Sequence, residues 1–363
     1  MTSATDTVSS ADDPFAQGAG FVNPNGAADP GLVYPTTPNE YRQYLVGLGV
    51  RFSRPFDTLT PVSASNLNQA SIAVGKLAGV ETVTRRVKNV GSAPATYTAS
   101  ANVPGFDVLV TPSAFTLAPG AEQTFTVRFT RTDAPLGDWA IGALTWSGGG
   151  HSVRSPIALQ PVAVSAPTEV HGEGASGSKE FQVTPGFTGS MDISVSGLVG
   201  VTPVTDSVVT GEFDINNPVA DPDTKQYTVV VPAGTKAARF SLDAADDSAD
   251  LDLFVYLEGE FVDLSASGAA DEQITLLAPD AGTYDVYVNG FATPGGSTSY
   301  ELANFVVGPD DLGNASVSPD PAAVTTGVPV TLTASWTGLD VTKRWLGVIS
   351  YSGADAVTLL SVG

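Results

Sequence analysis

The stretch Leu117-Ala-Pro-Gly-Ala-Glu-Gln-Thr-Phe-Thr-Val-Arg-Phe129 decides the fold class of this chain. It opens with a Pro-Gly turn, after which Phe125, Val127 and Phe129 alternate with polar residues. Alternation with a period of two places every second side chain on the same face of a strand. The segment is therefore predicted to be a β-strand with one buried face.

The same element, a Pro/Gly turn followed by an alternating strand, returns along the chain. It is repeated at 231–242, 277–288 and 325–336. Short strands joined by turns in this way are typical of immunoglobulin-like sandwiches. The chain is therefore predicted to be mostly β and to consist of tandem immunoglobulin- or fibronectin-like β-sandwiches.

The composition excludes several classes of function. With 363 residues the chain has room for two or three domains. Its formal net charge of −22 repels nucleic acid and anionic membranes, so neither is expected as a partner. The absence of Cys removes disulfides and thiolate metal sites, and two His are too few for a histidine-rich metal centre.

The first 60 residues contain the one convincing helix of the sequence. Thr37 is the predicted N-cap, Pro38 stands at the first helical position, and Glu40 completes a capping box with Thr37. The apolar stripe of this helix consists of Tyr41, Tyr44, Leu45 and Leu48. Since little else in the first 60 residues could form a core for this stripe, the segment is interpreted as the end of a domain whose body lies elsewhere.

The segment Asp13-Pro-Phe-Ala-Gln-Gly-Ala-Gly-Phe-Val-Asn-Pro-Asn-Gly-Ala-Ala-Asp-Pro-Gly-Leu-Val-Tyr34 resembles a stretch of the subtilisin-like serine proteases (subtilases, peptidase S8 family). That stretch closes their catalytic domain and has the typical pattern Gly-Ala-Gly-His-Val-Asn-Pro-x-x-Ala-x-x-Pro-Gly-Leu-Val-Tyr. Phe21 stands here where the family usually has His. Residues 66–74, 83–91 and 146–157 are similar to the fibronectin type III-like domain that follows the catalytic domain in those proteases.

The later part of the chain carries a second resemblance. Residues 225–307, with Asp247-Ser-Ala-Asp-Leu-Asp-Leu-Phe-Val-Tyr256, resemble the pre-peptidase C-terminal (PPC) domain of secreted bacterial peptidases. With breaks placed in Gly/Ser/Pro-rich stretches, four parts are predicted. They are the end of a subtilase catalytic domain (1–61), a fibronectin type III-like domain (62–165), a PPC-like β-sandwich with its linker (166–308) and a short immunoglobulin-like β module (309–363).

The resemblance to subtilases implies a secreted endopeptidase that uses an Asp, a His and a Ser. In the family the nucleophile lies in a Gly-Thr-Ser-Met-Ala turn upstream of the segment with which this chain starts, and these 363 residues contain no such turn. No catalytic residue is assigned, Met1 is interpreted as an internal methionine, and the chain alone is predicted to be inactive.

The expected function is that of an accessory region. It would stabilise the upstream catalytic domain, its partner in cis, or position a protein or peptide substrate. The alternative is a free-standing extracellular binding protein for a carbohydrate, collagen-like or cell-wall ligand.

Neither histidine is predicted to be catalytic. His151 begins a strand after a Gly-rich turn, where packing or a hydrogen bond is the expected role. His171 lies in the predicted linker, which cannot hold a base in the position that catalysis needs. Trp146 and Trp336 lie in alternating strands and are predicted to be buried rather than to form a surface for sugars.

An acidic segment supplies the only candidate metal ligands. Carboxylates at short spacing in a loop between strands suit Ca²⁺, the one cofactor predicted. Asp252 alternates with Leu251 and Leu253, so its side chain should face away from the core. The alternative is a solvated acidic loop, since the sequence lacks the Asp-x-Asp-x-Asp-Gly pattern of an EF-hand. The candidate ligands are Asp243, Asp246, Asp247, Asp250 and Asp252.

Overall fold

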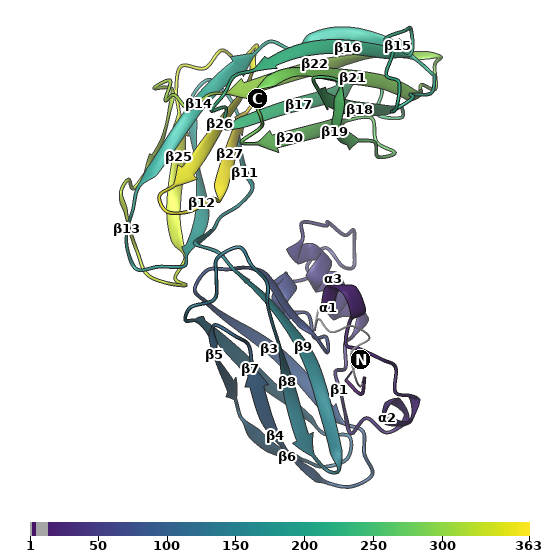
Figure 1. Cartoon of the computed structure of the whole chain (residues 1–363), viewed down its shortest axis with the longest axis vertical. Helices are drawn as coiled ribbons and strands as arrows, with labels where there is room; N and C mark the ends of the chain where they lie inside the picture. The colour runs from purple at the N-terminus through teal and green to yellow at the C-terminus, as the bar shows by residue number, and fades with distance from the viewer. Residues whose placement is uncertain (1, 5–13) are drawn as a thin grey trace. The chain divides into compact units, whose positions relative to one another are not determined.

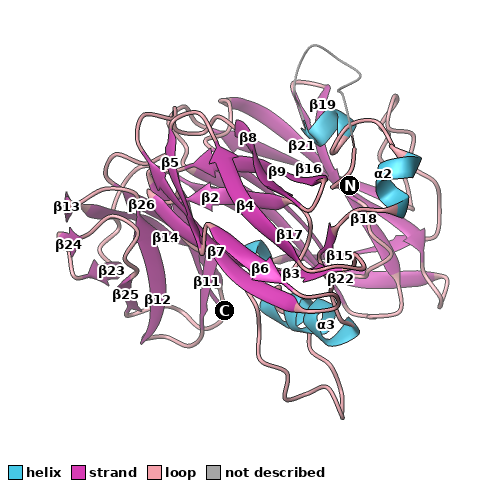
Figure 2. Ribbon diagram, turned by 90° about the horizontal axis from the view of Figure 1, so that it is seen from below, coloured by secondary structure: helices cyan, strands magenta, loops and turns pink. Residues whose placement is uncertain are grey.

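The computed structural model describes residues 2–4 and 14–363. Strands dominate this part of the chain (Figure 2), which confirms the predicted mostly β fold class. The chain divides into two compact units, one made mainly of the residues up to 165 and the other mainly of those after it. The described helices are α1 (Pro14–Gln17), α2 (Pro24–Ala28), α3 (Pro38–Gly47) and the 3-10 helix η1 (Ala64–Asn66).

The first unit is built on two β-sheets, here called the first sandwich (Figure 1). One sheet has the strand order β1-β3-β7-β5, with antiparallel pairs. The other has the order β2-β9-β8-β4-β6, in which β2 and β9 are parallel and the other neighbours antiparallel. The strands are β1 (Leu32–Val33), β2 (Ile72–Leu77), β3 (Val80–Asn89), β4 (Ala95–Asn102), β5 (Phe106–Thr111), β6 (Ala114–Leu117), β7 (Glu122–Arg131), β8 (Ala140–Gly148) and β9 (His151–Pro161).

The core of the first sandwich is formed by the alternating residues that the sequence singles out. Phe125, Val127 and Phe129 of β7 are all buried, and Phe125 meets the fully buried Trp146 of β8 edge to face. The burial of Trp146 confirms the predicted role of this residue. Each buried aromatic side chain removes a large apolar area from water, so this cluster contributes to the stability of the first unit.

The N-terminal segment is built into the first sandwich at β1. Leu32 and Val33 pair with Asn89 and Lys88 of β3, and the Leu32 side chain is fully buried in the sandwich core. The sequence predicts the end of a preceding domain up to residue 61. In the structure, part of that stretch supplies a strand and a core residue to the first sandwich.

The second unit contains a sandwich of eight consecutive strands, here called the second sandwich. Its sheets have the orders β15-β22-β17-β20 and β16-β21-β18-β19. Leu251, Leu253 and Val255 of β18 are buried in its core, as their alternation predicts. The strands are β15 (Val204–Val209), β16 (Thr224–Val231), β17 (Ala237–Ala244), β18 (Asp250–Leu257), β19 (Glu260–Ser265), β20 (Glu272–Leu277), β21 (Gly282–Ala292) and β22 (Ser297–Val307).

The remaining strands come from both sides of the second sandwich in the sequence and form what we call the third sandwich. Its main sheets have the orders β10-β12-β25-β23 and β11-β27-β26-β14, and β13 pairs with β24. The strands before the second sandwich are β10 (Val164–Ser165), β11 (Glu169–Gly172), β12 (Gly177–Pro185), β13 (Gly189–Met191) and β14 (Ile193–Val201). Those after it are β23 (Ala315–Ser318), β24 (Ala322–Val324), β25 (Val330–Trp336), β26 (Arg344–Tyr351) and β27 (Val357–Val362).

This arrangement differs from the predicted division at residue 308. The sequence treats 309–363 as a module of its own, whereas in the structure its strands pair with β11, β12 and β14. About 55 residues form too few strands for two complete sheets that bury a core between them. The strands of this segment therefore pair with strands that precede the second sandwich in the sequence. Residues predicted to be a linker, including His171, are consequently strand residues.

The second and third sandwiches share a small hydrophobic cluster. Phe305 and Val307 of β22 pack with Leu346 and Val348 of β26, all of them buried. Beside this cluster, the guanidinium of Arg239 forms two hydrogen bonds of 2.7 and 2.6 Å with the carboxylate of Glu169. These contacts hold the two sandwiches together within the second unit. None of the described helices is long and apolar enough to span a membrane.

Candidate docking surface on the first unit

Helix α3 leaves several of its apolar side chains exposed. Its capping box is formed as predicted, with Glu40 N donating to Thr37 Oγ1 at 3.3 Å and Thr37 N donating to Glu40 Oε2 at 2.7 Å. No residue of α3 is buried, and the exposed set includes Tyr41 and Leu45, followed by Leu48 at the C-cap, which is 56% exposed. Contiguous exposed apolar side chains of this kind mark interaction surfaces.

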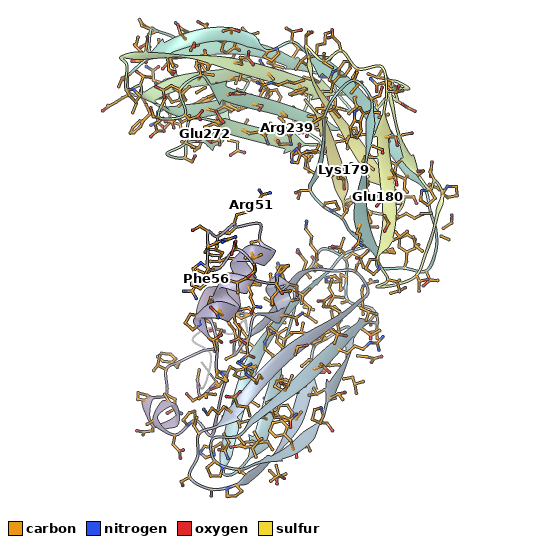
Figure 3. All side chains as sticks on the ribbon, turned by 180° about the vertical axis from the view of Figure 1, so that it is seen from behind. Arg51, Phe56, Lys179, Glu180, Arg239 and Glu272 are labelled. Carbon is orange, nitrogen blue, oxygen red and sulfur yellow. The ribbon has the colours of Figure 1, made fainter. Side chains whose placement is uncertain are left out.

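Polar contacts fix α3 on the first sandwich. Arg86 of β3 forms ion pairs of 3.1 Å with Glu40 of α3 and with Glu122 of β7. Val62 N donates to Gln43 O at 3.1 Å, which ties the chain after α3 back to the helix. The loop between them carries Phe56, which is labelled in Figure 3. The guanidinium of Arg42 stacks on the ring of Phe56 at 4.0 Å. The exposed face of α3 is therefore held in a defined position on the sandwich.

Asn68 joins the segment before α3 to strand β3 through hydrogen bonds. Its Nδ2 donates to Pro35 O at 2.6 Å and to Arg86 O at 3.0 Å, and its Oδ1 accepts from Arg86 N at 2.7 Å. Nearby, the hydroxyl of Tyr34 lies 2.8 Å from Ser155 Oγ, and burial raises the pKa of Tyr34. Because these bonds join the N-terminal segment to β3 and β9, this segment and the first sandwich act as one body.

A cavity of about 350 Å³ opens beside α3. Tyr41 and Tyr44 of the helix line it together with Leu67 and Arg85, which is the one charged residue among the described residues of the lining. Arg85 is 3% exposed, and burial lowers its pKa to about 10, so it is still charged at neutral pH. No sequence pattern singles out this cavity, because its walls come from α3, η1, β2, β3 and the loop between η1 and β2, which only the fold brings together.

A second hollow, of about 210 Å³, lies where β2 and β9 run parallel. It is almost wholly apolar and is lined by Phe15 of α1, Ile72 of β2 and Ile157 of β9, among others. Phe15 also meets Trp139 edge to face, with ring centroids 4.8 Å apart. The hollow adds apolar surface to the same unit, and none of the described residues that line it has a titratable side chain.

The predicted calcium ligands are not gathered around one point. Asp243 is paired with Arg344 at 2.7 Å, and Asp246 accepts hydrogen bonds of 3.0 and 2.6 Å from Ser248. Asp247 is exposed, and Asp250 is half-buried. Within residues 2–4 and 14–363, no three His, Asp or Glu side chains are arranged to hold a metal ion. Calcium binding by this segment stays a prediction, which titration calorimetry with Ca²⁺ tests.

Asp252 occupies the position that its alternation predicts. It is half-buried on the outer face of β18, directly across from Asn289 of β21. Burial, with a further contribution from Asp250 and Glu272, raises the pKa of Asp252 to about 6. Glu272 of β20, one of these two contributors, is buried (Figure 3). Its carboxylate accepts hydrogen bonds from Ser267 N and Oγ at 2.8 and 2.5 Å.

The contacts of the two histidines are those of residues with a structural role. His151 Nε2 lies 3.1 Å from Asp29 Oδ2, and its ring packs against Gly31, as expected for a residue that packs at a strand start. His171 Nδ1 lies 2.8 Å from Ser361 Oγ and 3.6 Å from Glu169 Oε1. A serine triad needs the serine on one ring nitrogen and the acid on the other, so this trio does not form one.

Comparison with known proteins identifies two domains. Residues 66–159 match the family described as fibronectin type-III domain, and residues 223–290 match the bacterial pre-peptidase C-terminal domain. The chain is 38% identical to subtilisin-like protease SBT2.5 of Arabidopsis thaliana over 154 residues, which are 40% of this chain and 19% of that protein. It is 38% identical to subtilisin-like protease SBT5.4 of the same plant over 157 residues, 40% of this chain and 20% of that protein.

The match to these relatives is partial: the chain spans about a fifth of the length of the curated relatives it matches. Among solved structures, it is similar to the secreted serine protease VesC from Vibrio cholerae, with a TM-score of 0.24, 11% identity, and coverage of 66% of this chain and 50% of that one. The pre-peptidase C-terminal domain of a collagenase from Bacillus anthracis gives a TM-score of 0.22 and 13% identity, over 39% of this chain and all of that one. TM-scores this low do not show a common fold for whole chains.

These findings confirm the two resemblances read from the sequence. The chain contains a fibronectin type III-like domain, which lies in the first sandwich, and a PPC domain, which lies in the second. Its homologues over the fibronectin-like region are subtilisin-like proteases.

Proposed function

We propose that this chain is the C-terminal accessory region of a secreted subtilisin-like serine endopeptidase, and that its first unit docks on the catalytic domain of that protease in cis. The observation that carries the proposal is the exposed apolar face of α3, because it belongs to a segment that resembles the end of a subtilase catalytic domain. The similarity of this chain to the plant subtilisin-like proteases supports the choice of partner.

The proposed role of the first unit is mechanical. Because ion pairs and backbone hydrogen bonds hold α3 on the first sandwich, a catalytic domain packed on α3 would be braced by the sandwich core. Burial of exposed side chains such as Leu45 and Leu48 would supply the free energy of docking, at about 25 cal/mol for each Å² of apolar surface. The second and third sandwiches would then extend from the protease and contact its protein substrate.

The reading frame upstream of Met1 tests this proposal most directly. An in-frame Gly-Thr-Ser-Met-Ala turn within a few dozen codons is expected, since that turn carries the nucleophile in subtilases. A stop codon and a ribosome-binding site at that position would overturn the proposal. They would favour the alternative of a free-standing extracellular binding protein.

Substitution in the joined protease tests docking itself. Leu45→Glu combined with Leu48→Glu should lower the melting temperature of the catalytic domain, because two charges would be buried in the interface. Leu109→Glu on β5 is the matched control, since Leu109 is 60% exposed on the same sandwich and away from α3. An equal effect of the control, or no effect of the double variant, would contradict docking through α3.

A further inference from the structure

We propose that the cavity beside α3 is a carboxylate-binding site, in which Arg85 receives an Asp or Glu side chain of the docked partner. The inference rests on the proposed function for the identity of that partner, a subtilase catalytic domain. It goes further by naming the chemical group that the docking surface recognises and the residue that recognises it.

Among the described residues, no carboxylate pairs with the charge of Arg85. Its Nε donates to Gln69 O at 3.0 Å, Nη1 to Ser65 O at 2.7 Å and Thr84 O at 2.9 Å, and Nη2 to Ser71 O at 2.9 Å. These bonds use four of the five N–H groups of a guanidinium, and the remaining Nη2–H has no partner among the described residues. All four acceptors are neutral carbonyl groups, so the site keeps a net positive charge.

The other buried arginine that the structure describes, Arg239, is paired with a carboxylate, and so are two of the half-buried ones. Arg239, which is also almost fully buried, is held by both oxygens of Glu169. Arg86 pairs with two carboxylates, and so does Arg344. Among the described residues, Arg85 is the buried arginine that lacks such a partner, although the chain carries 38 Asp and Glu against 16 Lys and Arg.

A buried charge without a counter-ion is costly, and an incoming carboxylate would relieve that cost. Hydrogen bonds between a guanidinium and a carboxylate are roughly twice as strong as those between neutral groups. The cavity that Arg85 lines has room for such a side chain, and the phenols of Tyr41 and Tyr44 on its wall supply further possible hydrogen-bond donors. The chemistry of the site thus selects an anion.

The surroundings of the cavity indicate that the anion belongs to a protein surface. The cavity opens beside the exposed apolar residues of α3, including Leu45 and Leu48. Arg and Tyr are enriched among the residues that dominate the binding energy of protein interfaces, and both types line this cavity. A carboxylate inserted at Arg85 would fix the orientation in which the apolar surface of the catalytic domain packs on α3.

The test uses the whole 363-residue chain labelled with ¹⁵N and two small probes. The first probe, N-acetyl-glutamic acid α-amide, has one carboxylate, and the second, N-acetyl-glutamine α-amide, has the same shape without the charge. We expect the first probe to shift the Arg85 Nε–H signal with a Kd on the order of 10 mM, and the second to bind about tenfold more weakly.

Two single-residue variants test whether the probe binds at Arg85. Arg85→Lys should weaken binding of the first probe severalfold, because the three N–H groups of an ammonium cannot make the four backbone hydrogen bonds and also donate to the probe. Arg128→Lys is the matched control on the exposed face of β7, and it should leave the titration unchanged. The comparison of the two probes on the wild-type chain stands even where Arg85→Lys does not fold. Equal shifts with both probes, or no saturable shift, would overturn the carboxylate site.

This result is independent of the reading frame that tests the proposed function. Failure of the probe to bind, with a catalytic domain encoded upstream, would remove the carboxylate site and leave the docking proposal in place. Binding of the probe, with a stop codon upstream, would overturn the catalytic domain as the owner of the carboxylate.

Discussion

Gly31 shows how a single residue allows the N-terminal segment to join the first sandwich. Its φ is +69°, and a Cβ at this position would lie 2.6 Å from Cγ of His151. Gly31→Ala is expected to lower the free energy of unfolding of the first unit by about 2–4 kcal/mol, because a left-handed backbone is combined with an overlap against a packed ring.

The matched control for this prediction is Gly120→Ala in the same sandwich. Gly120 has φ of +76° but nothing within 4 Å of its Cβ, so only the backbone cost of about 1 kcal/mol is expected. Urea unfolding followed by ¹⁹F NMR of fluorotryptophan reports the first unit through the buried Trp146. Equal costs for both substitutions would show that the contact with His151 does not constrain this segment.

Asp252 makes the stability of the second sandwich depend on pH. Burial raises its pKa from the usual 3.8 to about 6, so the folded chain favours the protonated carboxyl. The stability of the sandwich therefore falls as pH rises from about 4 through 6. Asp252→Asn should raise the free energy of unfolding by about 1–2 kcal/mol at pH above 7, a value reduced for partial exposure, and by nothing below pH of about 4.

Hydrogen exchange of the β21 amides at two pH values measures this difference. Asp263→Asn is the matched control, because it removes an exposed carboxylate from β19 in the same sheet. A stabilisation of Asp252→Asn that is the same at both pH values would contradict the assignment of the effect to ionisation of Asp252.

At the scale of elements, strand β1 decides whether the N-terminal segment is part of the first sandwich. Leu32 is fully buried among the core residues, so Leu32→Ala should cost about 2–4 kcal/mol through the cavity that it leaves. Val22→Ala is the control, since Val22 is 80% exposed and should cost less than about 0.5 kcal/mol. The Trp146 signal during urea unfolding measures both, and similar small costs would show that β1 is dispensable.

The elements that the sequence predicts well are those whose signal is local. The capping box of α3 and the buried alternating residues of β7, β18 and β25 depend on spacing within a few residues, and the structure has them as predicted. Strand β11 escapes prediction because Glu169-Val-His-Gly172 is short and follows a Pro, and its parallel partner β27 lies almost 190 residues later. The cavity at Arg85 also escapes prediction, since residues of α3, η1, β2 and β3 meet around it only in the fold.

At the scale of the whole molecule, the third sandwich links the two ends of the second unit. Strands β12 and β14 receive their main pairing from β25 and β26, which lie beyond the second sandwich in the sequence. Local patterns cannot predict such pairing, because the strands before the second sandwich and those after it both show ordinary alternation of apolar and polar residues. The predicted boundary at residue 308 follows the composition of the chain, whereas the strand pairing crosses it.

This pairing predicts the effect of a truncation after Gly308. The shortened chain should lose protection from hydrogen exchange in β12 and β14, because β14 would have no partner strand and β12 would keep only its two-residue pairing with β10. The apolar side chains of Phe181 and Ile193 would then face water. Strands β18 and β21 should keep their protection, since their partners and core lie within residues 204–307. A peptide of residues 309–363 added in trans should restore protection to β12 and β14 through the same pairing. Unchanged protection of those two strands in the truncated chain would mean that residues 309–363 are a separate module after all.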